Sequence, residues 1–112
     1  MEEDIVGTDN IYNILIGRNA QGNWDAISAS DQNDIWFHID GHPSPHIILK
    51  TNGLKLNKIE KNVIKACALK CKEYSKFANI RKITIIYTEI KNVSKADKIG
   101  AVYTKNLRSI VI

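Results

Sequence analysis

Hydrophobic and polar residues alternate over several short segments of the chain, which predicts a β-sheet. Within residues 35–40, the apolar Ile35, Phe37 and Ile39 occupy every second position, as in a strand with one buried face. Glycine, proline and asparagine residues, which favour turns, separate these segments. The predicted strands cover residues 11–16, 35–40, 46–50 and 83–88, with weaker ones at 99–103 and 109–112.

A helical repeat of apolar residues predicts one long helix from Asn57 to about Ala78, and a short helix is expected at residues 24–29. Asn57 is a suitable N-cap, and Glu60 follows three residues later, as in a capping box. Lysines form a second stripe along the long helix: Lys58, Lys61, Lys65, Lys72 and Lys76. One long helix among five or six strands, joined mostly as hairpins, indicates an α+β fold. We expect a mostly antiparallel sheet with this helix packed on one face.

The length and composition suit a single domain. The chain has 112 residues, of which 44% are hydrophobic and 25% charged, as in ordinary globular proteins. The periodic patterns begin at residue 11. We therefore expect one domain over residues 11–112, preceded by a loose acidic segment over residues 1–10.

Nothing in the sequence suggests secretion or membrane insertion. No apolar run approaches the roughly 20 residues of a membrane span, and the first residues are acidic where a signal peptide is basic. Cys67 and Cys71 lie four residues apart on the apolar side of the predicted long helix. We expect them to be reduced thiols in the core of a cytoplasmic protein.

Charge is distributed unevenly along the chain. Residues 1–40 contain eight acidic residues and one basic residue, whereas residues 41–112 contain fifteen basic and four acidic residues; the net charge is +4. If the fold preserves this polarity, the basic side would attract a polyanion such as a nucleic acid. The alternative is a solvated lysine surface without a partner.

All the histidines lie close together in the sequence: His38, His42 and His46. If the two strands that flank the proline-rich turn pair as a hairpin, Asp40 lies opposite His46 and Trp36 opposite Lys50, close enough for a cation–π contact. Imidazole and carboxylate groups can bind a metal or act as acid and base, but this spacing matches no closed zinc pattern. The alternatives are a structural role or a polar and aromatic surface that contacts a base or a phosphate.

The segment 17–23 contains two glycines but lacks the Lys-Ser/Thr pair of a nucleotide-binding phosphate loop. Arg18 and Asn23 could still hydrogen-bond a backbone phosphate of a nucleic acid. The alternative is that both residues only shape the turn.

Taken together, these motifs resemble the NFACT-R domain family, which has an Asp-x-Trp-Phe-His-Val strand followed by a small-residue turn and a histidine that opens the next strand. The resemblance covers roughly residues 11–112. It rests on Asp34-Ile35-Trp36-Phe37-His38-Ile39, Pro43-Ser44-Pro45-His46-Ile47-Ile48, Gly17-Arg18-Asn19 with Asn23, Ile86-Tyr87-Thr88, Lys91-Asn92-Val93, Gly100 and Ser109-Ile110-Val111.

The resemblance implies a non-catalytic nucleic-acid-binding module without metal or cofactor. In larger members the domain follows other modules in ribosome-associated quality control factors, which bind the large ribosomal subunit with tRNA, and it was proposed to bind RNA. Stand-alone eukaryotic members carry a coiled-coil tail, and DNA binding is attributed to one such group. This chain is expected to be a stand-alone member without that tail.

The sequence departs from the family pattern at two positions, one in the turn and one at the end of the strand before it. Pro45 stands in a turn that usually reads Gly-Ser-His, and it removes a backbone N–H that could meet a phosphate. Asp40 stands where larger members often have a basic residue.

The resulting hypothesis is sequence-tolerant binding of RNA, either ribosomal RNA or tRNA, through phosphate contacts, with DNA as an alternative partner. Trp36 or Tyr87 would stack on an exposed base. Two other hypotheses are a protein-interaction adaptor with an exposed edge strand at 109–112, and a small metal-dependent hydrolase that uses His38, Asp40 and His46. The candidate nucleic-acid contacts are Arg18, Asn23, Trp36, His38, His46, Lys50, Lys61, Lys65, Lys72 and Lys95.

Overall fold

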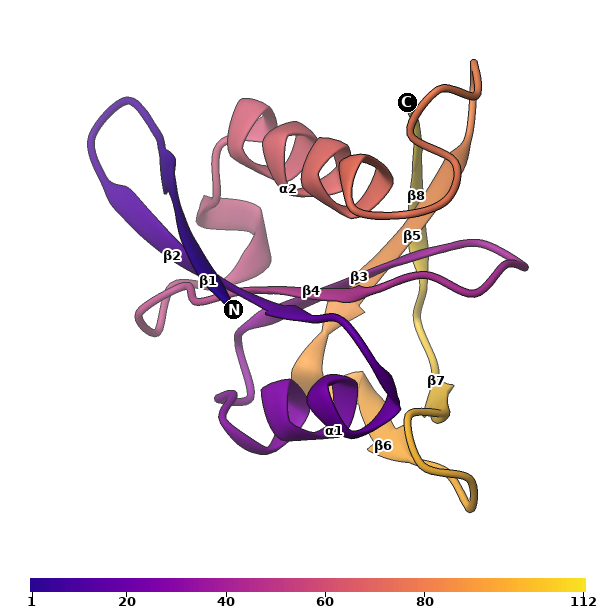
Figure 1. Ribbon diagram of the computed structural model, residues 1–112. Coiled ribbons are helices and arrows are strands. Elements are labelled where there is room, and N and C mark those ends of the chain that lie inside the picture. Colours follow the sequence, from indigo (N-terminus) through magenta and orange to yellow (C-terminus); the bar gives the residue numbers. More distant parts are fainter.

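A six-stranded sheet forms the centre of the computed structural model, which describes all 112 residues (Figure 1). The strand order is β1-β2-β4-β3-β5-β8, and every neighbouring pair is antiparallel. Strands β6 and β7 pair with each other in a separate hairpin. The predicted α+β class and antiparallel sheet are confirmed. The strands are β1 (Glu2–Val6), β2 (Ile11–Gly17), β3 (Ile35–Ile39), β4 (His46–Leu49), β5 (Thr84–Glu89), β6 (Val93–Lys95), β7 (Val102–Thr104) and β8 (Arg108–Val111).

Both faces of the sheet are covered. Helix α2 (Lys61–Glu73) lies across one face, and helix α1 (Ala20–Ser28) lies on the other face together with the β6–β7 hairpin (Figure 1). Two short 3-10 helices, η1 (Leu56–Lys58) and η2 (Ile90–Asn92), occur in the connections. Neither α-helix has the length and hydrophobicity of a membrane span. The predicted long helix covers one face, and the layer on the opposite face was not foreseen.

The main core lies between the sheet and α2. Alternate strand residues point into it, among them Ile14, Phe37 and Ile47, which are completely buried. Burying one such side chain contributes about 1.5–3 kcal/mol, so this interface is the main source of stability. Cys67 and Cys71 pack here as free thiols, and burial raises the pKa of each to about 12. The predicted core position of both cysteines is confirmed.

A smaller core lies on the opposite face of the sheet. Trp36 and Ile48 pack there against Ala26 and Ile27 of α1 and against Ile90. The sequence pattern placed Trp36 on a polar outer face of its strand. That prediction is wrong because α1 covers this face, and a sheet covered on both sides has strands that are buried on both sides.

The first residues of the chain belong to the sheet. β1 pairs with β2 along its length, and Ile5 enters the main core. The Glu3 carboxylate accepts a hydrogen bond from the Tyr74 hydroxyl and lies 3.0 Å from Lys70 Nζ; these two contacts lower the Glu3 pKa. The prediction of a loose segment over residues 1–10 is therefore wrong, because Ile5 and Glu3 fasten this strand to the sheet and to α2.

The start of α2 differs from the prediction. Glu60, not Asn57, is the N-cap, and η1 with its Lys58 precedes the helix. The Glu60 carboxylate accepts a hydrogen bond from the backbone N–H of Thr8 at 2.8 Å and so braces the β1–β2 turn instead of closing a capping box.

The end of α2 also comes earlier than predicted. The Ser75 hydroxyl donates to the Lys72 carbonyl oxygen at 2.7 Å and accepts from the Phe77 backbone N–H at 3.0 Å. These bonds turn the chain just after Glu73. Lys76 therefore lies in the following loop, and the predicted stripe of five lysines on one helix is wrong at both ends.

Helix α1 begins earlier than predicted, at Ala20. Asn19 is its N-cap, with Oδ1 accepting from the Gly22 N–H at 2.7 Å. Gly17 ends β2 against this helix so closely that a Cβ there would lie 2.4 Å from Asn23 Oδ1. Glycine at position 17 is thus required by the close approach of β2 to α1.

Candidate nucleic-acid interface

Strands β3 and β4 pair two residues out of the predicted register. Trp36 lies opposite Ile48, which brings His38 beside His46 with ring centroids 5.1 Å apart and planes at 88°. The predicted contact of Trp36 with Lys50 is therefore wrong. A shift of two residues keeps the same side chains on each face, so the hydrophobic pattern could not distinguish the two registers.

Hydrogen bonds connect three of the motif residues, Trp36, His46 and Asn23, which lie in β3, β4 and α1. Trp36 Nε1–H donates to His46 Nδ1 at 3.0 Å, and the His46 backbone N–H donates to Asn23 Oδ1 at 3.1 Å. The His38 ring stacks on Trp36 at 5.5 Å between centroids, with 4° between the planes. Trp36 is only 2% exposed, so the prediction that it stacks on a nucleic-acid base is wrong. Its role is to orient His46.

The two neighbouring histidines are uncharged at neutral pH. Burial, and secondarily the neighbouring His38, lowers the pKa of His46 to about 3. Burial also lowers the pKa of His38. Because His46 Nδ1 accepts a hydrogen bond, the proton of the neutral ring lies on Nε2. The pair therefore offers hydrogen bonds without positive charge.

The side chains that the hydrolase hypothesis needs as metal ligands, His38, Asp40 and His46, do not form a metal site. No three side chains among the histidines, cysteines and carboxylates lie close enough together to bind a metal. Asp40 is exposed on the β3–β4 turn, whereas His46 is buried in the strand that follows. The predicted pairing of Asp40 with His46 is thus absent.

Three adjoining cavities form a groove beside the histidine pair. The first, of about 400 Å³, lies between α2, the β3–β4 turn and the start of α1. It shares Asn23, Pro43 and Ser44 with a second cavity of about 360 Å³. The second shares His38 and His46 with a third cavity of about 260 Å³ under the loop before β7. We refer to these three cavities together as the groove.

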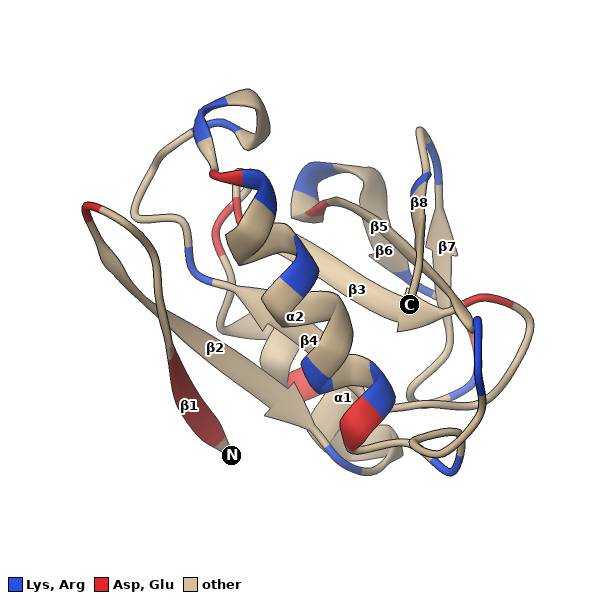
Figure 2. Cartoon of the chain, turned by 90° about the horizontal axis from the view of Figure 1, so that it is seen from above, with Lys and Arg blue, Asp and Glu red and all other residues tan.

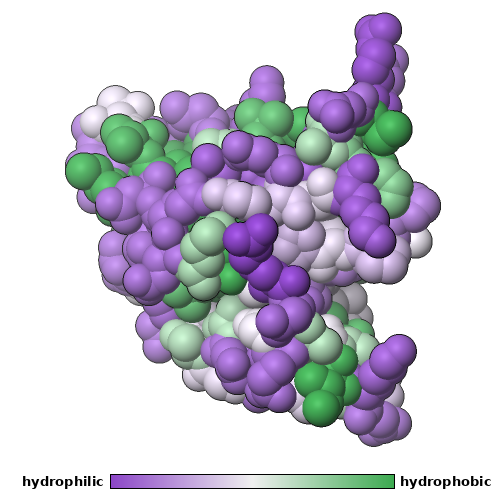
Figure 3. Space-filling model, viewed as in Figure 1, coloured by the Kyte–Doolittle hydropathy of each residue, from purple (hydrophilic) through white to green (hydrophobic).

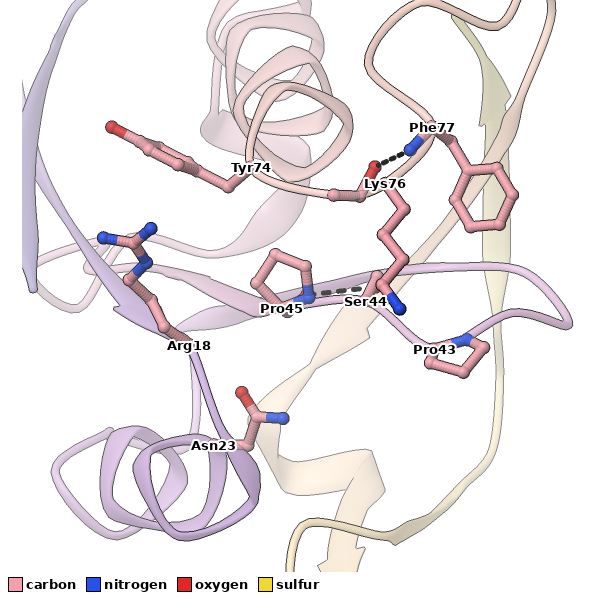
Figure 4. A pocket seen from close by; sticks show the side chains of 9 residues that line it. Arg18, Asn23, Pro43, Ser44, Pro45, Tyr74, Lys76 and Phe77 are labelled. Carbon is pink, nitrogen blue, oxygen red and sulfur yellow. Dashed lines mark hydrogen bonds between the residues drawn. The ribbon is translucent and has the colours of Figure 1, made fainter.

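Two cations and two aromatic rings surround the first cavity. Figure 4 shows Arg18 and Lys76 on opposite sides of Pro45. The Arg18 guanidinium lies over the Tyr74 ring, 5.6 Å from its centroid. Phe77 completes the wall. Neither Arg18 nor Lys76 takes part in an ion pair, so both charges are available to an anion.

The groove opens on the face shown in Figure 3. On that face the surface is hollowed between the part built on α2 and the part built on α1 and the β6–β7 hairpin, and hydrophilic residues cover most of the rim. Lys98, in the loop between β6 and β7, lines the second cavity. It supplies a cation on the side of the groove that is built on α1 and the β6–β7 hairpin. Cations thus lie on both sides of the uncharged histidine pair.

Lys50 lies outside the groove and is occupied by a structural contact. Its Nζ lies 2.6 Å from Asp34 Oδ2, and Asp34 is only 1% exposed. The same carboxylate accepts hydrogen bonds from the backbone N–H groups of Thr51 and Asp31. Asp34 and Lys50 thus fix the opposite end of β3 and β4, and neither lines the groove.

The other predicted cations lie on separate surfaces. On α2, the Lys72 Nζ donates to the carbonyl oxygen of Ile112 at 3.2 Å, and Lys61 and Lys65 line none of the three cavities of the groove. Lys95 lies over the Trp24 ring, 5.5 Å from its centroid. Figure 2 shows cationic segments on α2 and on several loops, with acidic segments among them. The basic half of the sequence therefore does not form one continuous face.

Sequence reasoning missed most of the groove wall. The predicted helix runs to Ala78 and so includes Tyr74, Lys76 and Phe77, whereas in the structure these residues are the C-cap of α2 and part of the loop after it. In the sequence, Lys98 is only one of the fifteen basic residues within 41–112, and no pattern distinguishes it from the others. The signal that could have placed Lys76 in a loop was Ser75, a residue that favours local bonds to the backbone.

A family model and several known proteins match this chain. A family model described as the NFACT protein RNA binding domain matches residues 5–106. Coiled-coil domain-containing protein 25 from Bos taurus and from Mus musculus is 33% identical over 86 residues, which is 75% of this chain, and the protein of that name from Danio rerio is 31% identical. The chain matches only 41–42% of the length of these relatives.

A solved structure shares the fold. The C-terminal part of the fibronectin/fibrinogen-binding protein from Streptococcus suis superposes with a TM-score of 0.84 over 98% of this chain and 44% of that chain. At 22% sequence identity this likeness concerns the fold alone. The matched family region includes the Trp36–His46–Asn23 hydrogen bonds and the groove beside them. This chain belongs to the NFACT-R family, the NFACT protein RNA binding domain.

Proposed function

We propose that this chain binds single-stranded RNA in the groove, without catalysing a reaction. The observation that supports the proposal most directly is the pairing of free cations with partly exposed aromatic rings around one cavity: Arg18 and Lys76 beside Tyr74 and Phe77. Proteins that bind single strands without sequence preference combine a basic groove for the backbone with rings on which bases stack. The family description, RNA binding domain, agrees with this arrangement.

The charges fit a strand that runs along the groove. Arg18 and Lys76 would hold phosphates at the first cavity, and Lys98 would hold one at the second. The Asn23 side chain lines both the first and the second cavity. Its Oδ1 accepts a hydrogen bond from the His46 backbone N–H, whereas its Nδ2 has no protein partner and can donate to a phosphate oxygen. Counterion release at these contacts would provide salt-dependent and sequence-tolerant affinity.

The biological RNA would be ribosomal RNA or tRNA, in a cytoplasmic protein linked to ribosome-associated quality control. This part of the proposal rests on membership of the family. Unpaired bases, which the groove requires, occur in loops and ends of both RNAs. Competition of labelled single-stranded RNA by tRNA, and by a fully paired RNA duplex, would separate these substrates: tRNA should compete and the duplex should not.

Titration of the purified chain against a short labelled single-stranded RNA tests the proposal. We expect binding at low salt that weakens as salt rises, with a slope of log K against log salt of about −0.7 for each phosphate contact. For the three cations of the groove, the slope would be roughly −2. Absence of RNA binding at low salt would reject the proposal.

A second candidate function is a protein-interaction adaptor that uses the edge strand β8. This strand pairs only with β5, so its outer edge carries unpaired backbone groups, and Val111 on it is 59% exposed. Such an edge can accept a strand from a partner protein. Capture of ribosomal proteins that survives nuclease treatment, and that is lost in a Val111→Pro variant, would favour this function over RNA binding.

A further inference from the structure

His46 has one polar atom that the fold does not use. Its backbone N–H donates to Asn23 and its Nδ1 accepts from Trp36, but its Nε2 contacts no protein partner. The side chain is nevertheless almost completely buried, at 3% exposure. Every fully buried polar side-chain atom of the molecule has a partner, so this Nε2 must reach the solvent of the groove that His46 lines.

The orientation of this unused atom is fixed. The hydrogen bond from Trp36 leaves the proton of the neutral ring on Nε2, which makes that atom a donor. The ring is held by Trp36 on one side and by the perpendicular His38 ring on another. A donor that is already oriented loses little conformational freedom when it binds a ligand.

His46 lines two of the cavities, and they differ in charge: Lys98 lines the second, whereas no cation and no carboxylate lines the third. The walls of the third cavity combine the Trp36, His38 and His46 rings with Ile86 and the segment 100–104. Placing a phosphate there would remove an anion from water without a compensating charge, which is costly. The uncharged parts of a nucleotide, its ribose and its base, do not carry this penalty.

We propose that His46 Nε2–H, in the uncharged third cavity, donates a hydrogen bond to an uncharged oxygen of a bound RNA nucleotide, either the ribose 2′-hydroxyl or a base carbonyl. The proposal rests on the RNA-binding function proposed above. It divides the groove into two kinds of subsite. Arg18, Lys76 and Lys98 bind phosphates, whereas His46 reads a neutral group on the same strand.

The variant His46→Asn tests the donor with little change to the fold. The asparagine Oδ1 can take the place of Nδ1 and accept from Trp36, while the Nε2–H is lost. We expect His46→Asn to bind oligouridylate RNA roughly five- to tenfold more weakly than the wild type, as for loss of one hydrogen bond. The salt slope should not change, because no charge is removed, whereas Arg18→Ala should reduce it.

Two further ligands distinguish the two oxygen sources. Oligoadenylate RNA has no base carbonyl, and the deoxyuridine oligomer has no 2′-hydroxyl. If His46 binds a carbonyl, His46→Asn weakens both uridine oligomers and leaves oligoadenylate binding unchanged. If it binds the 2′-hydroxyl, the substitution weakens both RNAs and leaves the deoxy oligomer unchanged; either result supports the proposal.

Nitrogen-15 NMR of the wild-type histidines gives a measurement that needs no variant. The free protein should show His46 as the neutral tautomer protonated at Nε2, and saturation with RNA should shift this resonance. If RNA binds but neither the His46 resonance nor the affinity of His46→Asn changes, the inference is overturned and the RNA-binding function stands. If the wild type binds none of the oligomers at low salt, the proposed function fails and the inference fails with it.

Discussion

The hydrogen bond from Trp36 Nε1 to His46 Nδ1, 3.0 Å long, joins β3 to β4 in the wall of the groove, which both residues line. Both residues are buried, so each polar atom depends on the other for its hydrogen bond. The bond also determines which nitrogen of His46 faces the groove. One buried contact thereby supports the fold and sets the chemistry of the surface above it.

Trp36→Phe should destabilise the protein because it leaves His46 Nδ1 buried without a donor. An unsatisfied buried polar atom costs about 1–3 kcal/mol of unfolding free energy, measurable by urea denaturation. The matched control is Trp36→Phe/His46→Phe, in which both polar partners are replaced. This double variant should be more stable than the sum of the single effects implies. Simple additivity would show that the bond does not couple the two residues.

Acid should destabilise the fold through His46 in a defined pH window. The His46 pKa is about 3 in the folded protein and near 6.5 when unfolded, so below about 6.5 the unfolded chain binds a proton that the folded chain does not. The unfolding free energy should then fall by up to about 1.4 kcal/mol for each pH unit. His38, whose pKa burial also lowers, acts in the same direction.

The His46→Asn variant isolates this effect. Its stability should decline less steeply than that of the wild type between about pH 6.5 and pH 4.5. The carboxylates with lowered pKa, Glu3 and Glu60, lose their stabilising contacts only below their usual value of 4.5 and therefore do not contribute in this window. Parallel pH profiles of the two proteins would contradict the assignment of a neutral, buried His46.

Gly17→Ala should destabilise the contact between β2 and α1. The added Cβ would meet Asn23 Oδ1 at 2.4 Å and Asn23 Cα at 2.7 Å, so the helix would have to move. Overpacking of this kind costs about 1–3 kcal/mol, and the displaced Asn23 should also weaken RNA binding. Gly22→Ala is the matched control, because the nearest atom to its new Cβ would be the Asn19 Oδ1 at 3.1 Å, and the nearest backbone atom, Gly17 Cα, would lie at 3.8 Å. Equal stability losses for the two variants would contradict this account.

Lys50→Met should affect stability and not RNA affinity, although the sequence suggested Lys50 as a nucleic-acid contact. The substitution leaves the buried Asp34 carboxylate without its cation. We expect a loss of about 1–3 kcal/mol, less than for a fully buried pair because Lys50 is 22% exposed. Denaturation of one preparation would measure the stability loss, and RNA titration of the same preparation would show whether the RNA affinity is unchanged. An RNA affinity that falls as much as in Arg18→Ala would place Lys50 in the interface.

Strand and helix positions followed from the sequence where hydrophobic periodicity was strong. The β3 and β4 strands and the centre of α2 lie where alternation and helical spacing predicted them. Alternation could not reveal that α1 covers the second face of the sheet, because burial on both sides depends on a distant segment. The acidic start of the chain was likewise misread, since only the fold brings Glu3 to Lys70.

The candidate site was less accessible to sequence reasoning than the fold. The motif residues Trp36, His46 and Asn23 do lie together in the structure, where they form part of the groove wall. The cations that remain free on its rim, Lys76 and Lys98, lie in loops whose positions depend on the end of α2 and on the β6–β7 hairpin. A stripe of lysines in a sequence does not show which of them border a cavity.

The most direct test compares two double variants that remove the same charge from different surfaces. Arg18→Ala/Lys76→Ala removes two cations from the groove, and Lys61→Ala/Lys65→Ala removes two from the outer face of α2. With both proteins folded, titration of single-stranded RNA at several salt concentrations should show an affinity loss of at least about tenfold for the groove variant. Its salt slope should become shallower by about 1.4. An α2 variant that loses as much affinity as the groove variant, or more, would contradict the account.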